Sequence, residues 1–426
     1  MNSSQRWILP CWEISPCVNR SVATLAKQKS TLKRAITLPL LVFYGTGTIL
    51  GAGIYALSGM IAGLSGVFAP VSFLLSALIA TFVAFTYAEL SSRYPKSAGE
   101  AFYVGKAFAW RGLSALVGWG IVFTGIVSAA VMARGFYGYL QELLPLPAAI
   151  LAFVFLITLV AIIGISLSVH VAALITLLEI SGILLVLYVT REHLFTLPQH
   201  WQTFVPPLTW PVWQNIVFGA FLAFYAYIGF EDMVNVAEEV IEPEKNLPTA
   251  IVLALLISTV FYMLIALALV SALPIDSLAE HAAPFAYLMQ QNSEIPSAMI
   301  SLISLIAILN AALVQIVMGS RVLYGMAEQH NAPQCFHVIH PGTRTPITAT
   351  LFFAVVLLVM ALWLPIEDLA RITSFIILSI FALVCLSLCL IKGRDEPSTH
   401  RRHLNVPVLV PGIGFLFCVG FIYLQL

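Results

Sequence analysis

The sequence predicts an all-α integral membrane protein with an inverted-repeat (5+5) fold, in which helices 1 and 6 are interrupted and one or two peripheral helices follow. Three observations predict this fold class. Of the 426 residues, 60% are apolar and only 9% are charged, whereas about 25% are charged in a soluble domain. Apolar runs of about 20 residues, the length that crosses a bilayer, recur along the chain. Two of these runs, the first and the sixth, are broken by glycine.

The composition excludes several classes of protein. A chain this apolar has too little polar surface for a soluble globule, which excludes soluble enzymes and disordered regulators. The 20 basic and 20 acidic residues give a formal net charge of zero, so we expect no nucleic-acid partner. The six cysteines show no zinc-type spacing, and we expect no metal site, no cofactor and no catalytic residue.

Eleven candidate membrane spans fill most of the chain. They are residues 37–60, 66–90, 112–141, 147–167, 169–190, 213–239, 247–273, 296–325, 346–364, 368–391 and 406–425. Residues 1–35 are expected to form a polar cytoplasmic tail, residues 36–395 a ten-helix transporter core and residues 396–426 a peripheral C-terminal helix. Within the core, the first repeat covers about 36–190 and the second about 213–391.

The basic residues predict which side of the membrane each loop occupies. If the N-terminus is cytoplasmic, 17 of the 20 basic residues lie in or next to cytoplasmic loops, and the other three are Arg134, Arg191 and Arg371. Cytoplasmic loops carry an excess of lysine and arginine, so we expect a cytoplasmic N-terminus. The compact loops favour a prokaryotic cell (inner) membrane.

The first span contains Gly45, Gly47, Gly51 and Gly53 within nine residues. Glycine is a poor helix former, and a broken backbone persists in a bilayer only where it lines a protein cavity or binds something. The stretch therefore predicts an interrupted helix. Close helix packing through small residues is the alternative.

The sixth span contains a second candidate interruption, where Gly229 and Phe230 are followed by Glu231 and Asp232. Adjacent acids inside a membrane are costly unless they face water or partners. Two broken helices at corresponding positions of two halves indicate an inverted-repeat secondary transporter. At such breaks, free N–H groups suit a carboxylate and free carbonyls suit an ammonium group, and a zwitterionic amino acid presents both.

Several motifs, taken together, resemble the amino acid–polyamine–organocation (APC) superfamily of permeases over roughly residues 33–395. Residues 47–55 (GTILGAGIY) resemble its first-span glycine pattern. Residues 94–103 (YPKSAGEAFY) resemble its Y-P-x-x-G-G-x-Y loop, with Glu100 in place of the second glycine. Residues 224–230 (FYAYIGF) resemble its F-F-A-Y-x-G-F stretch. The resemblance implies a core of two inverted five-helix repeats that imports or exchanges amino acids or related amines.

The resemblance also implies a substrate site at the two breaks. It places the substrate carboxylate on the backbone amides around Gly51, Ala52 and Gly53. It places the ammonium group near the carbonyls of Thr48, Ile49, Phe224, Ala226 and Tyr227. Phe224 is then either a gate over the substrate or an ordinary core aromatic.

Glu179 lies about halfway along span five, where several proton-coupled relatives have a lysine beside the first-span break. An ionised carboxylate at that depth costs about 2.5–3.5 kcal/mol or more, so it needs a partner, water or a proton. We expect Glu179 to be the proton-coupling residue. Two alternatives remain open: a permanently protonated packing residue bonded to a span-one carbonyl, and an ion pair with Arg134.

These observations predict secondary active transport of amino acids across the membrane, coupled to protons or possibly to sodium, and no enzymatic activity. An exchanger of amino acids, amines or polyamines is the main alternative. A channel or receptor is a more distant one, since no selectivity ring or filter sequence is evident. An intramembrane serine protease would need a base beside its serine, and all nine histidines fall in loops or at span ends in this layout.

Overall fold

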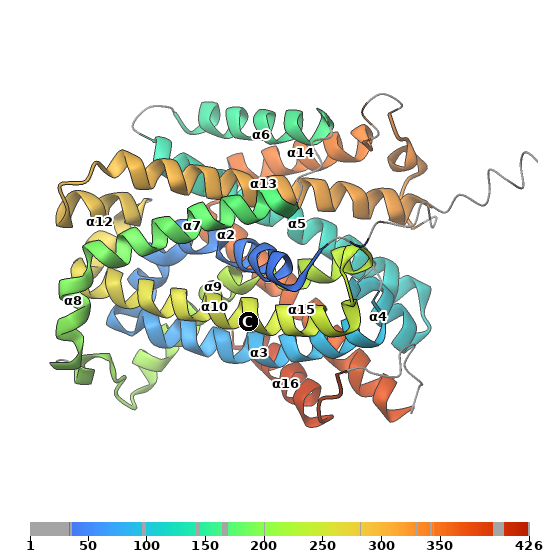
Figure 1. The fold of residues 1–426 in the computed structure, drawn as a ribbon, viewed down its shortest axis with the longest axis horizontal. Helices are drawn as coiled ribbons and strands as arrows, with labels where there is room; N and C mark the ends of the chain where they lie inside the picture. Colours follow the sequence, from blue (N-terminus) through green and yellow to red (C-terminus); the bar gives the residue numbers. More distant parts are fainter. Residues whose placement is uncertain are drawn as a thin grey trace, which may run out of the picture.

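The computed structural model describes residues 34, 36–95, 99–141, 145–163, 169–199, 201–281, 283–328, 331–340, 343, 345–394 and 404–424. Of the predicted N-terminal tail, only Arg34 lies among them. Long helices run side by side along the length of the molecule (Figure 1). In the parts of the chain given above, every named element is helical, and Ile36 and Val240 form an isolated parallel β-bridge.

The helices follow the chain in a simple order. They are α2 (Leu38–Ser65), η1 (Gly66–Phe68), α3 (Ala69–Arg93), α4 (Gly99–Phe108), α5 (Arg111–Leu140), α6 (Leu146–Ile163), α7 (Val169–Val189), α8 (Arg191–Thr196), η2 (Leu197–Gln199), η3 (Trp201–Phe204), α9 (Trp210–Tyr227), η4 (Glu231–Glu239), α10 (Pro243–Ala272), α11 (Ile275–Glu280), α12 (Pro284–Asn292), α13 (Ser297–Glu328), η5 (Gln334–His337), α14 (Ile347–Trp363), α15 (Ile366–Gly393) and α16 (Leu409–Tyr423). Each of the eleven predicted spans overlaps one of the longer helices.

Eight helices among the described residues are long and apolar enough to cross a membrane, or nine if a bent pair formed by α7 and the helix after it counts as one span. The apolar helices α14 and α16 are shorter, at 17 and 15 residues. In a bilayer a helix satisfies its own backbone hydrogen bonds, which explains why apolar runs adopt this structure. The prediction of an all-α membrane protein is confirmed, whereas the inverted pairing of two repeats stays a prediction.

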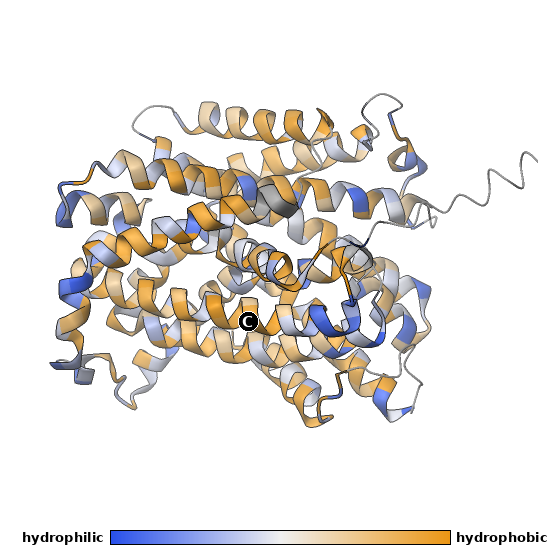
Figure 2. Ribbon diagram, viewed as in Figure 1, coloured by the Kyte–Doolittle hydropathy of each residue, from blue (hydrophilic) through white to orange (hydrophobic). Residues whose placement is uncertain are grey.

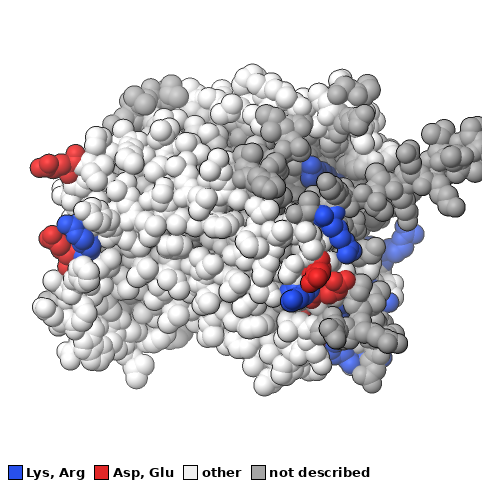
Figure 3. Space-filling model, viewed as in Figure 1, with Lys and Arg blue, Asp and Glu red and all other residues white. Residues whose placement is uncertain are grey.

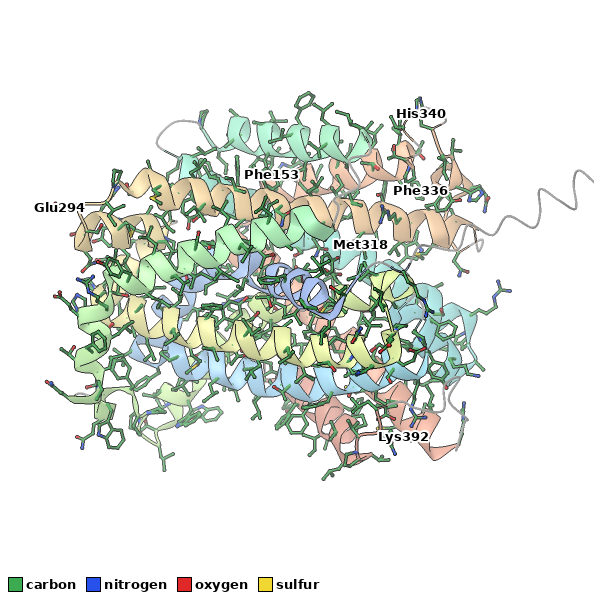
Figure 4. All side chains as sticks on the ribbon, viewed as in Figure 1. Phe153, Glu294, Met318, Phe336, His340 and Lys392 are labelled. Carbon is green, nitrogen blue, oxygen red and sulfur yellow. The ribbon has the colours of Figure 1, made fainter. Side chains whose placement is uncertain are left out.

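Polar residues gather at the two ends of the bundle, and apolar residues cover the helices between them (Figure 2). Glu294 lies at one end, and His340 and Lys392 lie at the other (Figure 4). On the face drawn in Figure 3, lysine and arginine gather mainly at the end where α4 lies. This asymmetry agrees with the charge pattern from which a cytoplasmic N-terminus was predicted, and it assigns α4 to the expected cytoplasmic end.

A buried ion cluster joins α3, α15 and the segment before α16. Arg93 Nη2 lies 2.6 Å from Glu89 Oε1, and Lys392 Nζ lies 2.8 Å from Glu89 Oε2. The backbone N–H of Val406 donates to Glu89 Oε2 at 2.8 Å. One carboxylate thus pairs with two cations and also holds the segment before α16 against the core.

Replacing Glu89 with alanine should strongly destabilise the protein, because Arg93 and Lys392 would both lose their ion pairs with its carboxylate. Removing one partner of a buried ion pair typically costs about 3–5 kcal/mol. We expect a clear fall in Tm in detergent, measured by thermal unfolding. Glu192→Ala is the control, since Glu192 is exposed and its nearest basic atom, on Arg191, is 3.8 Å away. Equal Tm values for the two variants would contradict a structural role for Glu89.

Candidate functional site

The first membrane helix is interrupted at Gly51. Within α2 this residue has φ 8° and ψ −131°, which lie outside the helical range, while the helix continues on both sides. A Cβ atom on Gly51 would lie 3.2 Å from Ala311 Cβ of α13. The break therefore faces α13 at close range.

The sixth span is interrupted over Ile228–Phe230. Helix α9 ends at Tyr227, Ile228 is extended, and Gly229 has φ 131°, a conformation that favours glycine. The chain then continues as the 3-10 helix η4, starting at Glu231. The sixth span is thus two shorter helices joined by a kinked segment at Gly229, where the sequence predicted an interruption.

The two interruptions lie directly against each other. A Cβ atom on Gly229 would lie 2.7 Å from the carbonyl oxygen of Thr48 and 3.1 Å from the backbone nitrogen of Ile49. Thr48 Oγ1 lies 3.2 Å from the carbonyl oxygen of Gly229. The backbone groups freed by each break consequently share one buried region.

Glycine also allows α2 to pack closely on its neighbours. A Cβ atom on Gly53 would lie 2.6 Å from Ala226 Cα, and one on Gly47 would collide with Thr176 Oγ1. The two interpretations of this glycine-rich stretch therefore apply to different residues. Gly51 marks the break, whereas Gly47 and Gly53 lie at close helix contacts.

Tyr262 of α10, which the sequence analysis missed, connects the two breaks. Its buried hydroxyl lies 2.5 Å from the carbonyl oxygen of Ile49 and 2.6 Å from that of Ala226. One hydroxyl has a single hydrogen, so it cannot fully serve both acceptors at once. The available signal was a tyrosine in the middle of an apolar span, far from the interface where tyrosine is usually enriched.

The aromatic residues of the predicted site are fully buried. The Phe224 ring makes an edge-to-face contact with Phe381 of α15, with centroids 6.1 Å apart. The Tyr227 ring contacts the Tyr262 ring in the same way at 5.0 Å, and its hydroxyl donates to the carbonyl of Phe73 at 3.2 Å. Both rings thus border the region between the breaks, and the contact of Phe224 fits either a gate or a core residue.

Glu179 lies at the level of the first-span break. On the same helix, Thr176 meets Gly47, and Gly182 lies against the Tyr55 hydroxyl. Glu179 is midway between Thr176 and Gly182 on α7. The α2 residues that these two contact, Gly47 and Tyr55, have Gly51 at their midpoint, so Glu179 lies beside the break. The Tyr55 hydroxyl also donates to the backbone carbonyl of Glu179 at 2.9 Å.

The Glu179 side chain is fully buried, and neither carboxyl oxygen has a hydrogen-bond partner within the described part of the chain. Arg134 instead donates to the carbonyl of Leu362 at 3.0 Å. The structure therefore contains neither the hydrogen bond to a span-one carbonyl nor the ion pair with Arg134. A buried ionised carboxylate without a partner is very costly, so this site requires a proton or a bound cation.

A helical membrane bundle with two interrupted helices that meet at their breaks has the architecture of a secondary transporter. The chain belongs to the family described as amino acid permease, whose sequence model matches residues 36–426. The resemblance to the APC superfamily is thereby confirmed.

Individual relatives are similar at low identity over most of the chain. The branched-chain amino acid permease BcaP of Bacillus subtilis is 27% identical, with 93% of this chain and 89% of that protein covered. The methylthioribose transporter of the same organism is 27% identical, with 95% and 91% covered. The mitochondrial cationic amino acid transporter 3 of Arabidopsis thaliana is 27% identical, with 85% of this chain and 63% of that longer protein covered.

Proposed function

We propose that this protein is a secondary active transporter that imports amino acids together with protons. Membership of the amino acid permease family supports amino acid transport. Relatives named for branched-chain and cationic amino acids support an amino acid as the substrate. Import and proton coupling are inferred from the chemistry of the site.

The arrangement of two carbonyl groups, one from each break, carries this proposal. The oxygens of Ile49 and Ala226 are both within 2.6 Å of the single hydroxyl of Tyr262. An ammonium group has three N–H donors and can serve both oxygens, whereas the hydroxyl has one. We assign the substrate ammonium to this pair and its carboxylate to the amides around Gly51, Ala52 and Gly53. Thr48, Phe224 and Tyr227 border the same region.

Glu179 provides the proton coupling in this proposal. It is buried at the level of Gly51, and its carboxyl oxygens have no hydrogen-bond partner among the described residues. When ionised, it attracts a cation or holds the helix ends around the break. When protonated, it releases this hold and favours another state of the transport cycle.

Uptake into proteoliposomes tests the proposed function. We expect labelled leucine or arginine to accumulate above equilibrium when the outside is more acidic than the inside, without sodium. Flux that requires amino acid on both sides would favour the exchanger instead. Accumulation driven only by a sodium gradient would overturn proton coupling, and downhill flux alone would indicate a channel.

Replacing Tyr262 with phenylalanine should weaken substrate binding about tenfold, corresponding to about 1.4 kcal/mol. The variant removes the hydroxyl that holds the Ile49 and Ala226 carbonyls together, so the free protein no longer presents them as a preorganised pair for the ammonium group. Calorimetric titration of the purified protein measures the Kd. Tyr227→Phe is the matched control, since it removes a buried hydroxyl that binds Phe73 instead. Equal losses of affinity would contradict a special role for Tyr262.

A further inference from the structure

Three acidic side chains lie near the sixth-span break, two of them directly after it in the chain, and the mechanism proposed above does not use them. They are Glu100 of α4 and Glu231 and Asp232 of η4, here called the acidic cluster. Glu100 and Glu231 are almost fully buried, at 3% and 6% exposure, and Asp232 is partly buried. Their charges act on one another, Glu100 with Asp232 and Glu231 with both. Glu100 is also the residue that departs from the glycine of the family loop pattern.

Each carboxyl group of the acidic cluster accepts a hydrogen bond from a neutral group. Glu231 accepts one from the Gly229 N–H at 2.8 Å, and Asp232 accepts one from Gln315 Nε2 at 3.3 Å. Glu100 accepts one from the Tyr87 hydroxyl at 3.2 Å. No basic side chain of the described residues forms an ion pair with any of the three.

A second observation points to a missing ligand at the acidic cluster. Tyr103 is fully buried, and its hydroxyl has no hydrogen-bond partner in the described ranges. Its ring makes an edge contact with Tyr87, and its hydroxyl is close enough to interact electrostatically with Glu100. Among the described residues, the Tyr103 hydroxyl therefore lacks a hydrogen-bond partner, and the three carboxyl groups beside it lack a positive charge. Both observations indicate that something that binds here is missing.

A proton fits this site better than a metal ion does. A protonated carboxyl group carries no negative charge and has an O–H that can donate a hydrogen bond. Among the described residues, no three His, Cys, Asp or Glu side chains are arranged to hold a metal, and a proton needs no such convergence. Burial, and to a lesser degree the charge of Asp232, raises the pKa of Glu100 to about 7, although hydrogen bonds from the backbone and Tyr87 oppose the increase. Glu100 is therefore neutral at lower pH and becomes ionised as the pH rises through about 7.

We propose that Glu100, Glu231 and Asp232 form a second proton-binding site, distinct from Glu179, whose proton occupancy controls how firmly η4 packs on α3 and α4. When protons leave, three carboxylates repel across the contact between η4 and α4. The segment after the break then loosens at the expected cytoplasmic end. When protons are bound, the contact closes.

The remaining charged groups on the surrounding helices do not neutralise the acidic cluster. Arg93 and Lys392 bind Glu89, and Arg394 donates to the carbonyl of Ala107 at 2.7 Å. Lys106 of α4 and Lys245 of α10 are exposed. Other titratable groups on the packed helices include Tyr44 of α2, Tyr87 of α3, Glu244 of α10 and Cys385 of α15. Lys96 lies outside the described residues.

Hydrogen–deuterium exchange of residues 231–239 tests this proposal in purified full-length protein in nanodiscs without substrate. After correction for intrinsic exchange rates, we expect wild-type protection to fall as the pH rises through about 7. Glu100→Gln, a neutral isostere, should stay protected across that range. Asp232→Asn provides a second variant and should shift the transition to lower pH, because the charge of Asp232 raises the pKa of Glu100. Glu192→Gln, at an exposed site on α8, should behave like wild type.

Wild-type protection that does not depend on pH would overturn the proposal, as would an unchanged profile in both Glu100→Gln and Asp232→Asn. Restoration of protection by sodium at high pH would assign the site to a metal cation and not to protons. Because the assay contains no substrate, its result is independent of whether amino acids bind at the two breaks.

Discussion

Replacing Gly229 with alanine is expected to reduce transport at least about tenfold. Gly229 has φ 131°, a conformation that costs a residue with a side chain about 1–3 kcal/mol. The added Cβ would also lie 2.7 Å from Thr48 O and 2.8 Å from Thr48 C. These are backbone atoms, which cannot rotate away, so the two breaks must separate. Uptake normalised to the amount of folded protein measures the effect.

Gly325→Ala is the matched control for Gly229→Ala. Gly325 lies inside α13, and no heavy atom is within 4 Å of the position that its Cβ would occupy. Alanine is the better helix former by about 1 kcal/mol, so this variant should transport normally and unfold at a higher temperature. Normal uptake by Gly229→Ala would show that contact between the breaks is not needed for transport.

Residue types alone predicted that the first span is interrupted, but not which glycine forms the break. Gly51 departs from the helix, while Gly47 and Gly53 meet Thr176 and Ala226. A helix break and a close helix contact both favour glycine, because it has no side chain. The two roles differ only in the neighbouring helix and in the backbone angles of the glycine. Tertiary packing determines both, so a single sequence does not reveal them.

The limits of the membrane spans were largely predictable because each depends on a local run of apolar residues. Short helices such as α4 and α12 were not predicted, since they are amphipathic or polar and lie between spans. Tyr262 and Glu100 act on residues far away in the chain. Their partners are chosen by how α10 and α4 pack, so no local pattern identifies them.

Glu179→Gln should abolish the pH dependence of uptake while substrate binding is retained. Glutamine is a neutral isostere of the protonated acid, so the buried site keeps its shape and loses only the ability to release a proton. Since the carboxyl oxygens have no hydrogen-bond partner among the described residues, the substitution breaks no described bond. We expect accumulation driven by a pH gradient to fall to the level of simple equilibration. Exchange of labelled for unlabelled substrate should continue.

Glu179→Asp separates proton coupling from packing. Aspartate still titrates but is one methylene shorter, so a proton role predicts that some pH-driven accumulation returns, whereas a packing role predicts a greater loss of stability than in Glu179→Gln and no such recovery. The Tyr55 hydroxyl binds the backbone carbonyl of this residue, and that bond is available to both variants. Unchanged concentrative uptake by Glu179→Gln, with an unaltered pH profile, would exclude Glu179 as the coupling residue and leave the acidic cluster as the remaining proton site.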